Sequence, residues 1–289
     1  EIPRLVRLPE DQALINRLGF NNDGLESLIE KLQSRKSHGI LGINLGKNKD
    51  TPLEHAVDDY LKGLSATYAW ADYFCINISS PNTEDLRQLQ EGDQLSRLLD
   101  QLCRQREMLD REAEKKTPLL IKLAPDWKEE ALQQSIERIK TFPLDGVIAT
   151  NTTLSREGLT SPLARESGGL SGKPLLKSSN KVIKTLYREI GTQIPIIGVG
   201  GIFSASDIYE KISSILSSNN MVNFLNVYEL FVKHKNDEDF NKIKSKGFSD
   251  KKISLIRNEM EDDIRKVRKN LKINPVFTSD ISPINIGPI

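Results

Sequence analysis

Residues 73–83 read YFCINISSPNT, a short apolar run that ends in a cluster of small polar residues. Buried parallel strands have this form, because both faces of the strand are covered and polar residues return where it ends. The segment therefore predicts one strand of a parallel sheet. The same pattern recurs in four more segments, at residues 40–46, 119–124, 146–150 and 195–201.

Amphipathic patterns with helical spacing lie between these strands. Asp126 precedes one of them, and we expect it to be the N-cap. Alternation of strands and helices predicts βα units around a parallel sheet, and the spacing fits a (β/α)8 TIM-barrel type of fold with long loops. The predicted helices cover residues 52–64, 94–109, 127–139 and 178–190.

Composition excludes several classes of protein. The 289 residues carry 41 basic and 40 acidic side chains, and a net charge of +1 argues against a general nucleic-acid-binding protein. No apolar run approaches the ~18 residues of a membrane helix, and no secretory signal opens the chain. Two cysteines without metal-ligand spacing predict neither a disulfide scaffold nor a metal site, and favour a reducing compartment.

The composition changes near residue 212. All alanines, both tryptophans and both cysteines lie in residues 1–212, whereas residues 213–289 are rich in Asn, Lys, Ile and Ser. We therefore predict two parts, a barrel segment over 1–212 and an unrelated, helical or poorly ordered tail over 213–289. In the tail we expect a helix, or alternatively a substitute strand, over 221–231, and a helix over 249–273 that is either packed on a neighbour or bound to a partner.

The predicted strand ends share a polar theme. Asn44 and Asn77 lie inside two strands, and Asn151 follows a third. A buried amide must be hydrogen-bonded, so these ends predict a preorganised polar floor. Amides that alternate donors and acceptors suit a flat heteroaromatic ring.

Lys122 interrupts an otherwise apolar strand. A buried ammonium is costly unless an anion meets it, and a reduced flavin or a phosphate is such an anion. The alternative is a lysine that reaches solvent at a strand end. Two glycine-rich turns follow, at residues 168–172 and 198–201, and their backbone N–H groups are suited to a phosphate.

Ser80 lies at the end of the second strand, directly before Pro81. The chain has three histidines and none is near Ser80 in sequence, which argues against a Ser-His-Asp hydrolase. Ser80 is therefore either a base that removes a proton beside a carbonyl or a turn serine that bonds to its own backbone.

Six segments resemble, in order, motifs of the class 2 (quinone-dependent) dihydroorotate dehydrogenases. They are residues 14–22, 42–52, 77–83, 148–153, 168–172 and 196–202. The resemblance covers residues 1–212. It implies a barrel that uses FMN to oxidise dihydroorotate to orotate in pyrimidine biosynthesis, with quinone as the electron acceptor.

The resemblance also implies residue roles. Ser80 is the catalytic base, a position where class 1 members carry cysteine, and Thr83 and Phe20 shield it and relay its proton. Residues implied to bind substrate are Asn16, Arg17, Leu18, Gly19, Phe20, Asn77, Asn82, Asn151 and Thr152. Residues implied to bind FMN are Asn44, Asn77, Lys122, Thr150, Gly172 and Gly201.

The chain departs from the family pattern at both ends. Family members carry a membrane-binding helical segment, two further strands and a lysine-bearing strand end before the first motif, and an eighth strand near residue 213. We therefore expect about five of eight strands. The family is expected at the periphery of the cytoplasmic membrane, whereas this chain alone, without that anchor, is expected in the cytoplasm.

Three alternatives follow from these departures. The chain could be a catalytically inactive, truncated or chimeric remnant of the enzyme. It could instead be an interaction protein that acts through residues 213–289. A further alternative is another FMN barrel oxidoreductase that acts on a different pyrimidine ring, such as dihydrouracil.

Overall fold

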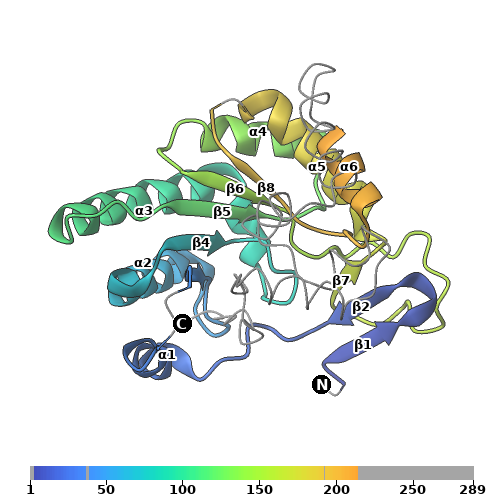
Figure 1. The fold of residues 1–289 in the computed structure, drawn as a ribbon, viewed down its shortest axis with the longest axis horizontal. Helices are drawn as coiled ribbons and strands as arrows, with labels where there is room; N and C mark the ends of the chain where they lie inside the picture. The colour runs from blue at the N-terminus through green and yellow to red at the C-terminus, as the bar shows by residue number, and fades with distance from the viewer. Residues whose placement is uncertain (1–2, 37–38, 192, 214–289) are drawn as a thin grey trace, which may run out of the picture. The chain divides into compact units, whose positions relative to one another are not determined.

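The computed structural model describes residues 3–36, 39–191 and 193–213. Its main element is a parallel five-stranded sheet in the order β3-β4-β5-β6-β8 (Figure 1). All five strands predicted from the sequence are present, and their parallel pairing is confirmed. The strands are β3 (Gly42–Leu45), β4 (Tyr73–Asn77), β5 (Leu119–Leu123), β6 (Gly146–Ala149) and β8 (Ile196–Gly198).

Helices follow the strands, as predicted, and α2 to α5 lie along the sheet in Figure 1. The α-helices are α1 (Gly24–Gln33), α2 (Ala56–Thr67), α3 (Gly92–Glu112), α4 (Glu129–Ile139), α5 (Leu175–Ile190) and α6 (Ala205–Ser213). Short 3-10 helices are η1 (Pro9–Asp11), η2 (Leu53–His55), η3 (Tyr68–Trp70) and η4 (Leu86–Gln90). None of the helices in the described ranges is both long and apolar enough to cross a membrane.

The apolar core lies between the sheet and the helices. Ile43, Phe74, Ile76 and Ile121 are fully buried there, and each contributes roughly 1.5–3 kcal/mol of transfer free energy. The other face of the sheet carries a smaller apolar cluster of Cys75, Leu120 and Ile148. Both faces of the strands are thus covered, which explains their nearly continuous apolar sequences.

Helix α4 corrects one prediction. It begins at Glu129, with Lys128 at the N-cap position, and not directly after Asp126. The Asp126 carboxylate instead accepts hydrogen bonds from Arg87 and from the backbone N–H of Leu154. An ion pair with another strand-end loop therefore outcompetes the local cap.

A second, antiparallel sheet was not predicted. It has the order β1-β2-β7 and consists of β1 (Leu5–Leu8), β2 (Ala13–Asn16) and β7 (Gly169–Gly172). Residues 168–172, interpreted above as a glycine-rich turn, are thus largely a strand. Glycine is needed there because a Cβ on Gly169 would lie 2.2 Å from Thr152 Oγ1, and one on Gly172 would lie 2.4 Å from the carbonyl oxygen of Gln12.

The small sheet lies beyond the carboxyl ends of the main strands, in the lower right of Figure 1. An antiparallel bridge between Thr153 and Leu170 joins it to the segment that follows β6. The two sheets therefore meet where the predicted polar strand ends lie. The helices predicted at 221–231 and 249–273 lie outside the described residues, as does the whole predicted tail after Ser213.

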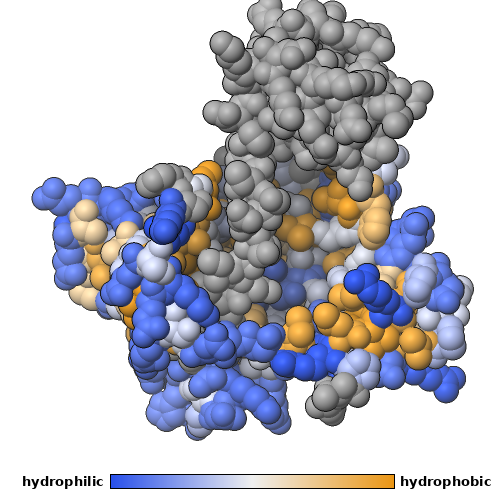
Figure 2. Space-filling view, turned by 60° about the horizontal axis from the view of Figure 1, so that its bottom comes forward, coloured by the Kyte–Doolittle hydropathy of each residue, from blue (hydrophilic) through white to orange (hydrophobic). Residues whose placement is uncertain are grey.

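The described residues leave several large apolar side chains exposed. In Figure 2, apolar surface gathers in patches between hydrophilic regions of this face. The exposed apolar side chains nearest to the end of β8 are Ile197, Val199, Ile202 and Phe203. β8 is at one edge of the five-stranded sheet and β3 at the other.

Candidate functional site

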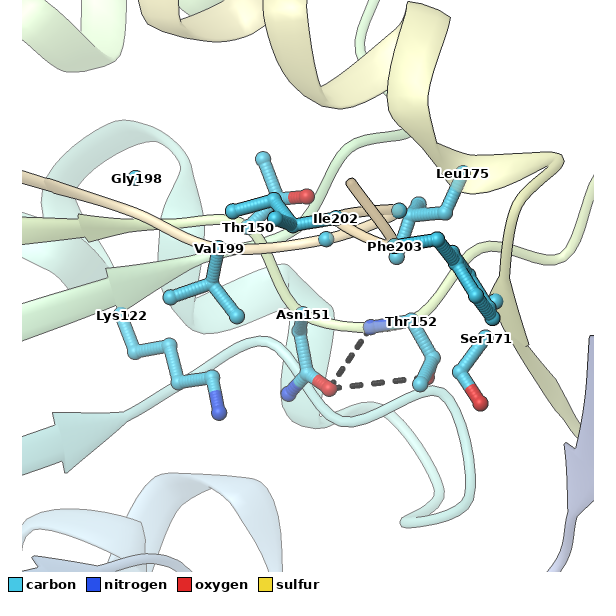
Figure 3. A pocket seen from close by; sticks show the side chains of 13 residues that line it. Lys122, Thr150, Asn151, Thr152, Ser171, Leu175, Gly198, Val199, Ile202 and Phe203 are labelled. Atoms are coloured by element: carbon cyan, nitrogen blue, oxygen red, sulfur yellow. Dashed lines mark hydrogen bonds between the residues drawn. The ribbon is translucent and has the colours of Figure 1, made fainter. Parts of the chain in front are cut away.

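A cleft of about 460 Å³ opens at the carboxyl ends of β5, β6 and β8 (Figure 3). The amino end of α5 and the end of β7 complete its wall. In open parallel α/β sheets this edge is where ligands bind, and the volume suits a ligand of nucleotide size. The cleft is lined by Lys122, Thr150, Asn151, Thr152, Ser171, Gly172, Leu175, Gly198, Val199, Gly200, Gly201, Ile202 and Phe203.

Lys122 supplies the cleft with positive charge. It lies on β5 directly opposite Asn77 of β4, and Figure 3 shows its side chain extending beyond the strand on the same side as Asn151. Within the described ranges its ammonium has neither a hydrogen bond nor an ion pair. The cation is therefore available to an anionic ligand.

Thr150 presents an unsatisfied hydroxyl. Its side chain is buried, and Oγ1 has no hydrogen-bond partner among the described residues. A buried hydroxyl without a partner costs about 1–3 kcal/mol, so such groups usually meet a ligand or water. Because Thr150 lines the cleft, its hydroxyl is available to a polar ligand atom.

Two glycines shape the end of the cleft beside α5. Gly200 has a φ of +110° and Gly201 a φ of +72°, which supports the predicted turn at 198–201. A Cβ on Gly201 would lie 2.5 Å from the backbone nitrogen of Leu176, in the first turn of α5. The glycines thus bring the loop against the helix amino end, whose free N–H groups and dipole favour a bound anion.

Two of the three amides of the predicted floor meet: Asn77 at the end of β4 and Asn151 after β6, with β5 between these strands in the sheet. The Asn151 side-chain amide donates to Asn77 Oδ1 (3.3 Å) and to Ser79 Oγ (3.0 Å). Asn77 Oδ1 also accepts from Ser79 Oγ at 3.0 Å. Asn151 Oδ1 accepts from the backbone N–H of Thr152 at 2.8 Å, one of the contacts drawn in Figure 3.

A second pair of amides joins the small sheet to the Ser80 loop. Asn82 Nδ2 donates to Asn16 Oδ1 at 2.9 Å, although the two residues are 66 positions apart. Asn16 Nδ2 in turn donates to the carbonyl oxygen of Gly169 in β7 at 3.3 Å. The pair therefore fixes the end of β2 beside the end of β4.

Ser80 lies in this polar region and is buried. Its Oγ accepts the backbone N–H of Asn82 at 3.3 Å, the local turn contact that one interpretation of the sequence predicted. Phe20 packs nearby, since a Cβ on Gly46 would lie 3.5 Å from its ring and 3.6 Å from the Asn77 carbonyl oxygen. Thr83 is also buried in this loop.

The remaining predicted residues take different places. Arg17 pairs with Glu166 at 2.9 Å and donates to the carbonyl oxygen of Ser167, so its guanidinium is held by the loop before β7. Leu18 contributes its carbonyl oxygen to Arg4. Gly19 has a φ of +61° and turns the chain toward Asn82.

Two predicted cofactor residues lie on strands at either side of the site. Asn44 is half-buried on β3, where it pairs in register with Cys75. Gly172 ends β7 and lines the cleft with a φ of +105°.

Cys75 is the nearest thiol to Lys122, and burial raises its pKa to about 11 despite the opposing effect of that lysine. The thiol is therefore protonated at neutral pH. Ser80 remains the hydroxyl that the sequence singled out in this region.

Arg87 was missed by the sequence analysis. It lies on η4 and contacts the loops that follow β4, β5 and β6. Its partners are 8, 39 and 65 residues away along the chain, so no local pattern identifies it.

Taken together, the cleft offers a cation, a hydroxyl without a partner among the described residues, and a glycine turn suited to an anion, next to an amide-rich floor. These groups match a flat heteroaromatic ligand that carries a phosphate, with a second planar, polar molecule beside it. Within the described residues, no cluster of three His, Cys, Asp or Glu side chains is arranged to hold a metal ion.

Comparison with known proteins gives a consistent family. The dihydroorotate dehydrogenase family model matches residues 1–228. The chain is 50% identical over 212 residues to a "Dihydroorotate dehydrogenase (quinone)" from Idiomarina loihiensis, covering 73% of this chain and 64% of that protein. It is also 50% identical over 213 residues to the protein of the same name from Chromobacterium violaceum, covering 73% of this chain and 62% of that one.

Solved structures give the same picture. A DHODH from Eimeria tenella in complex with ferulenol is 31% identical, with a TM-score of 0.68 over 96% of this chain and 73% of that chain. The barrel type of fold predicted from the sequence is thereby confirmed. The chain spans less than two thirds of the length of the two bacterial relatives, 64% and 62%.

Proposed function

This chain belongs to the dihydroorotate dehydrogenase family, and we propose that it takes part in the oxidation of dihydroorotate to orotate, a step of pyrimidine biosynthesis, with quinone as the electron acceptor. The observation that carries the proposal is that a cofactor-sized cleft and a group of fixed amides lie together at the carboxyl ends of the parallel strands. A cleft with Lys122, Thr150 and a glycine turn adjoins the amides of Asn77 and Asn151.

The cofactor of the proposal is FMN, and the residues of the cleft fit it. Among the described residues, Lys122 offers an unpaired cation and Thr150 an unpaired hydroxyl, and Gly201 approaches the amino end of α5 closely enough to suit a phosphate. Asn44, Asn77 and Gly172 are added on the strength of the family resemblance. When bound, FMN supplies the acceptor for the two electrons that leave the substrate.

The substrate of the proposal is a pyrimidine whose edge alternates donors and acceptors. Asn77 and Asn151 are held by each other and by Ser79, and Asn16 and Asn82 are held by each other. Amides fixed in this way are preorganised and lose little entropy when a ring binds. Residues 17–20 and Thr152 are included as binding residues on the strength of the resemblance.

Ser80 is the proposed base. It would take the proton from the substrate carbon next to the carbonyl and release its own hydroxyl proton, with Thr83 as the neighbouring group that passes this proton on. Burial of both side chains excludes bulk water, which limits exchange with solvent.

The proposed electron acceptor determines where in the cell the reaction would take place. Quinones are dissolved in the bilayer, so the proposal implies that the protein works at the periphery of the cytoplasmic membrane.

The test is a flavin absorbance spectrum of the purified chain, recorded before and after dihydroorotate is added. We expect a yellow protein that bleaches with dihydroorotate and does not bleach with dihydrouracil. Ser80→Ala should keep its flavin and lose the bleaching by about 10²-fold or more. A colourless protein would contradict the proposal, as would bleaching that Ser80→Ala leaves unchanged.

A further inference from the structure

Arg87 holds together three loops that carry the proposed site. Its Nε donates to the carbonyl oxygen of Ser79 at 3.1 Å, and Nη2 donates to the carbonyl oxygen of Thr152 at 2.9 Å. Nη1 pairs with Asp126 Oδ2 at 2.8 Å. All three nitrogens of the guanidinium are therefore used, each on a loop that follows a different strand.

Asp126 extends this connection. Its Oδ2 also accepts the backbone N–H of Leu154 at 2.9 Å, and its Oδ1 accepts the hydroxyl of Thr153. The loops after β5 and β6 are thus tied to each other as well as to Arg87. Charge-assisted bonds of this kind are stronger than neutral ones, and this pair is mostly shielded from solvent.

The helix that carries Arg87 is itself anchored. Gln90, in the same 3-10 helix η4, accepts the backbone N–H of Ala124 through Oε1 at 2.9 Å. Its carbonyl oxygen accepts the hydroxyl of Ser135 in α4 at 2.8 Å. The 3-10 helix η4 is therefore held in place, and the guanidinium of Arg87 sets the spacing of the three loops it contacts.

The contacts of Arg87 fall next to the residues that the proposed reaction needs. Ser79 directly precedes Ser80, and Thr152 directly follows Asn151. Both bonds are to backbone carbonyl oxygens, so they fix the course of the chain and leave the Ser80 and Asn151 side chains unoccupied by Arg87. A guanidinium provides this geometry because its donors form a rigid planar fork, whereas a lysine ammonium is a single point of charge.

We propose that Arg87 is a positioning residue that, with Asp126, sets the distance between the loop that carries Ser80 and the loop that carries the proposed substrate-binding residues Asn151 and Thr152. This inference rests on the proposed function, because it assigns Arg87 a part in that reaction. Arg87 lines no part of the flavin cleft, so its effect should be on the chemical step and not on cofactor content.

The experiment compares Arg87→Ala and Arg87→Lys with the control Arg104→Ala. Arg104 also pairs with an aspartate, Asp100, but on the exposed surface of α3. Three quantities are measured on the full chain: flavin content, kcat and KM for dihydroorotate, and hydrogen exchange of the backbone amides in residues 79–83 and 151–155. Free guanidinium ion is then added at low concentration to each variant.

We expect Arg87→Ala to keep its flavin while kcat falls roughly 10²-fold, because a shift of about 1 Å between reacting groups has that effect. KM should change less than kcat. Hydrogen exchange should rise in both segments together. The backbone N–H groups of Asn82 and Leu154 are bonded within loops that Arg87 no longer holds in place. Guanidinium should restore part of kcat in Arg87→Ala, and Arg87→Lys should stay impaired.

The outcomes separate this inference from the proposed function. If the wild-type chain oxidises dihydroorotate and Arg87→Ala does so equally well, the inference is overturned and the function stands. If the wild-type chain shows no turnover, the function fails, and exchange still decides whether Arg87 couples the two loops. Should Arg87→Ala not fold, Asp126→Asn removes the same ion pair with an isosteric side chain, and unaltered kcat and exchange in it would equally overturn the inference.

Discussion

Thr150 gives the sharpest prediction for a single residue, because its hydroxyl is buried and has no partner in the described part of the chain. In Thr150→Val a methyl group replaces that hydroxyl at nearly the same volume. Without flavin, the variant should be more stable than wild type by about 1 kcal/mol, since an unsatisfied polar group has been removed. With flavin, the hydrogen bond is lost and the dissociation constant should rise up to about tenfold. Urea unfolding and flavin titration measure the two effects.

Thr153 provides the matched control. It is equally buried, but its hydroxyl donates to Asp126 and accepts the backbone N–H of Ser155. Thr153→Val should therefore destabilise the flavin-free protein, the opposite sign to Thr150→Val. Equal effects of the two substitutions on stability would mean that the Thr150 hydroxyl already has a partner.

At this scale the sequence predicted residues whose type is unusual for their place. Asn77 and Lys122 lie in apolar strands, near the carboxyl ends of β4 and β5, on the side of the sheet where the cleft opens. The sequence did not predict the ion pair between Arg87 and Asp126, because these residues are 39 positions apart along the chain. Asp126 also misled the prediction, since a local capping pattern competes with a distant charge that only the fold brings near.

For elements, the loop between β8 and α6 carries the next prediction. Gly201→Ala should reduce flavin binding strongly, because a Cβ there meets the backbone of Leu176 at 2.5 Å and spreads the turn away from α5. The control is Gly158→Ala, whose φ of +75° matches the +72° of Gly201 but whose Cβ would meet nothing within 4 Å. Both variants bear the roughly 1–2 kcal/mol of left-handed strain. Equal flavin affinity in both would contradict the role given to this turn.

Lys211 connects α6 to α5 and gives a pH dependence. Its Nζ donates to Ser179 Oγ and to Asn180 Oδ1, and burial lowers its pKa from 10.5 to about 8. Between these two pH values the unfolded chain holds a proton that the folded chain has released. The contribution of Lys211 to the free energy of unfolding should therefore rise with pH from about 8 to 10.5, and be least favourable below that range.

The measurement is the difference in unfolding free energy between wild type and Lys211→Met across that pH range. Taking the difference cancels other groups, such as the Cys75 thiol, whose raised pKa acts with the opposite sign. Trp70 and Trp127 both lie in the described part of the chain and can report unfolding by fluorescence. A difference that stays flat with pH would contradict a lowered pKa for Lys211.

The elements themselves were largely predictable, for a clear reason. Buried parallel strands and the amphipathic face of α5, with Val182, Ile183, Leu186 and Ile190 inside, leave strong signals in the sequence. The small sheet leaves none. β7 reads Gly-Leu-Ser-Gly, and its glycines serve close packing against Thr152 and Gln12, which looks like a turn when those neighbours are not known.

At the scale of the whole molecule, the cleft lies where the five-stranded parallel sheet meets the three-stranded antiparallel sheet. β5, β6 and β8 supply one wall, and the end of β7 with the amino end of α5 supplies the other. The sequence could predict both halves of the site from their motifs. It could not predict that a three-stranded antiparallel sheet connects them, because β2 and β7 pair over about 150 residues of chain.

A ligand in this cleft should therefore stabilise the fold as well as occupy a site. Binding to the folded chain alone adds about 2.7 kcal/mol at a hundred times the dissociation constant, which for a domain of this size raises Tm by roughly 5–10 °C. FMN should give that shift in a thermal melt of the flavin-stripped chain. Riboflavin at the same concentration should give a smaller one, because it lacks the phosphate that the Gly200–Gly201 turn and α5 would hold. Equal shifts would mean that the ring alone binds and the turn does not act as an anion site, and no shift with either would remove the cleft as a flavin site.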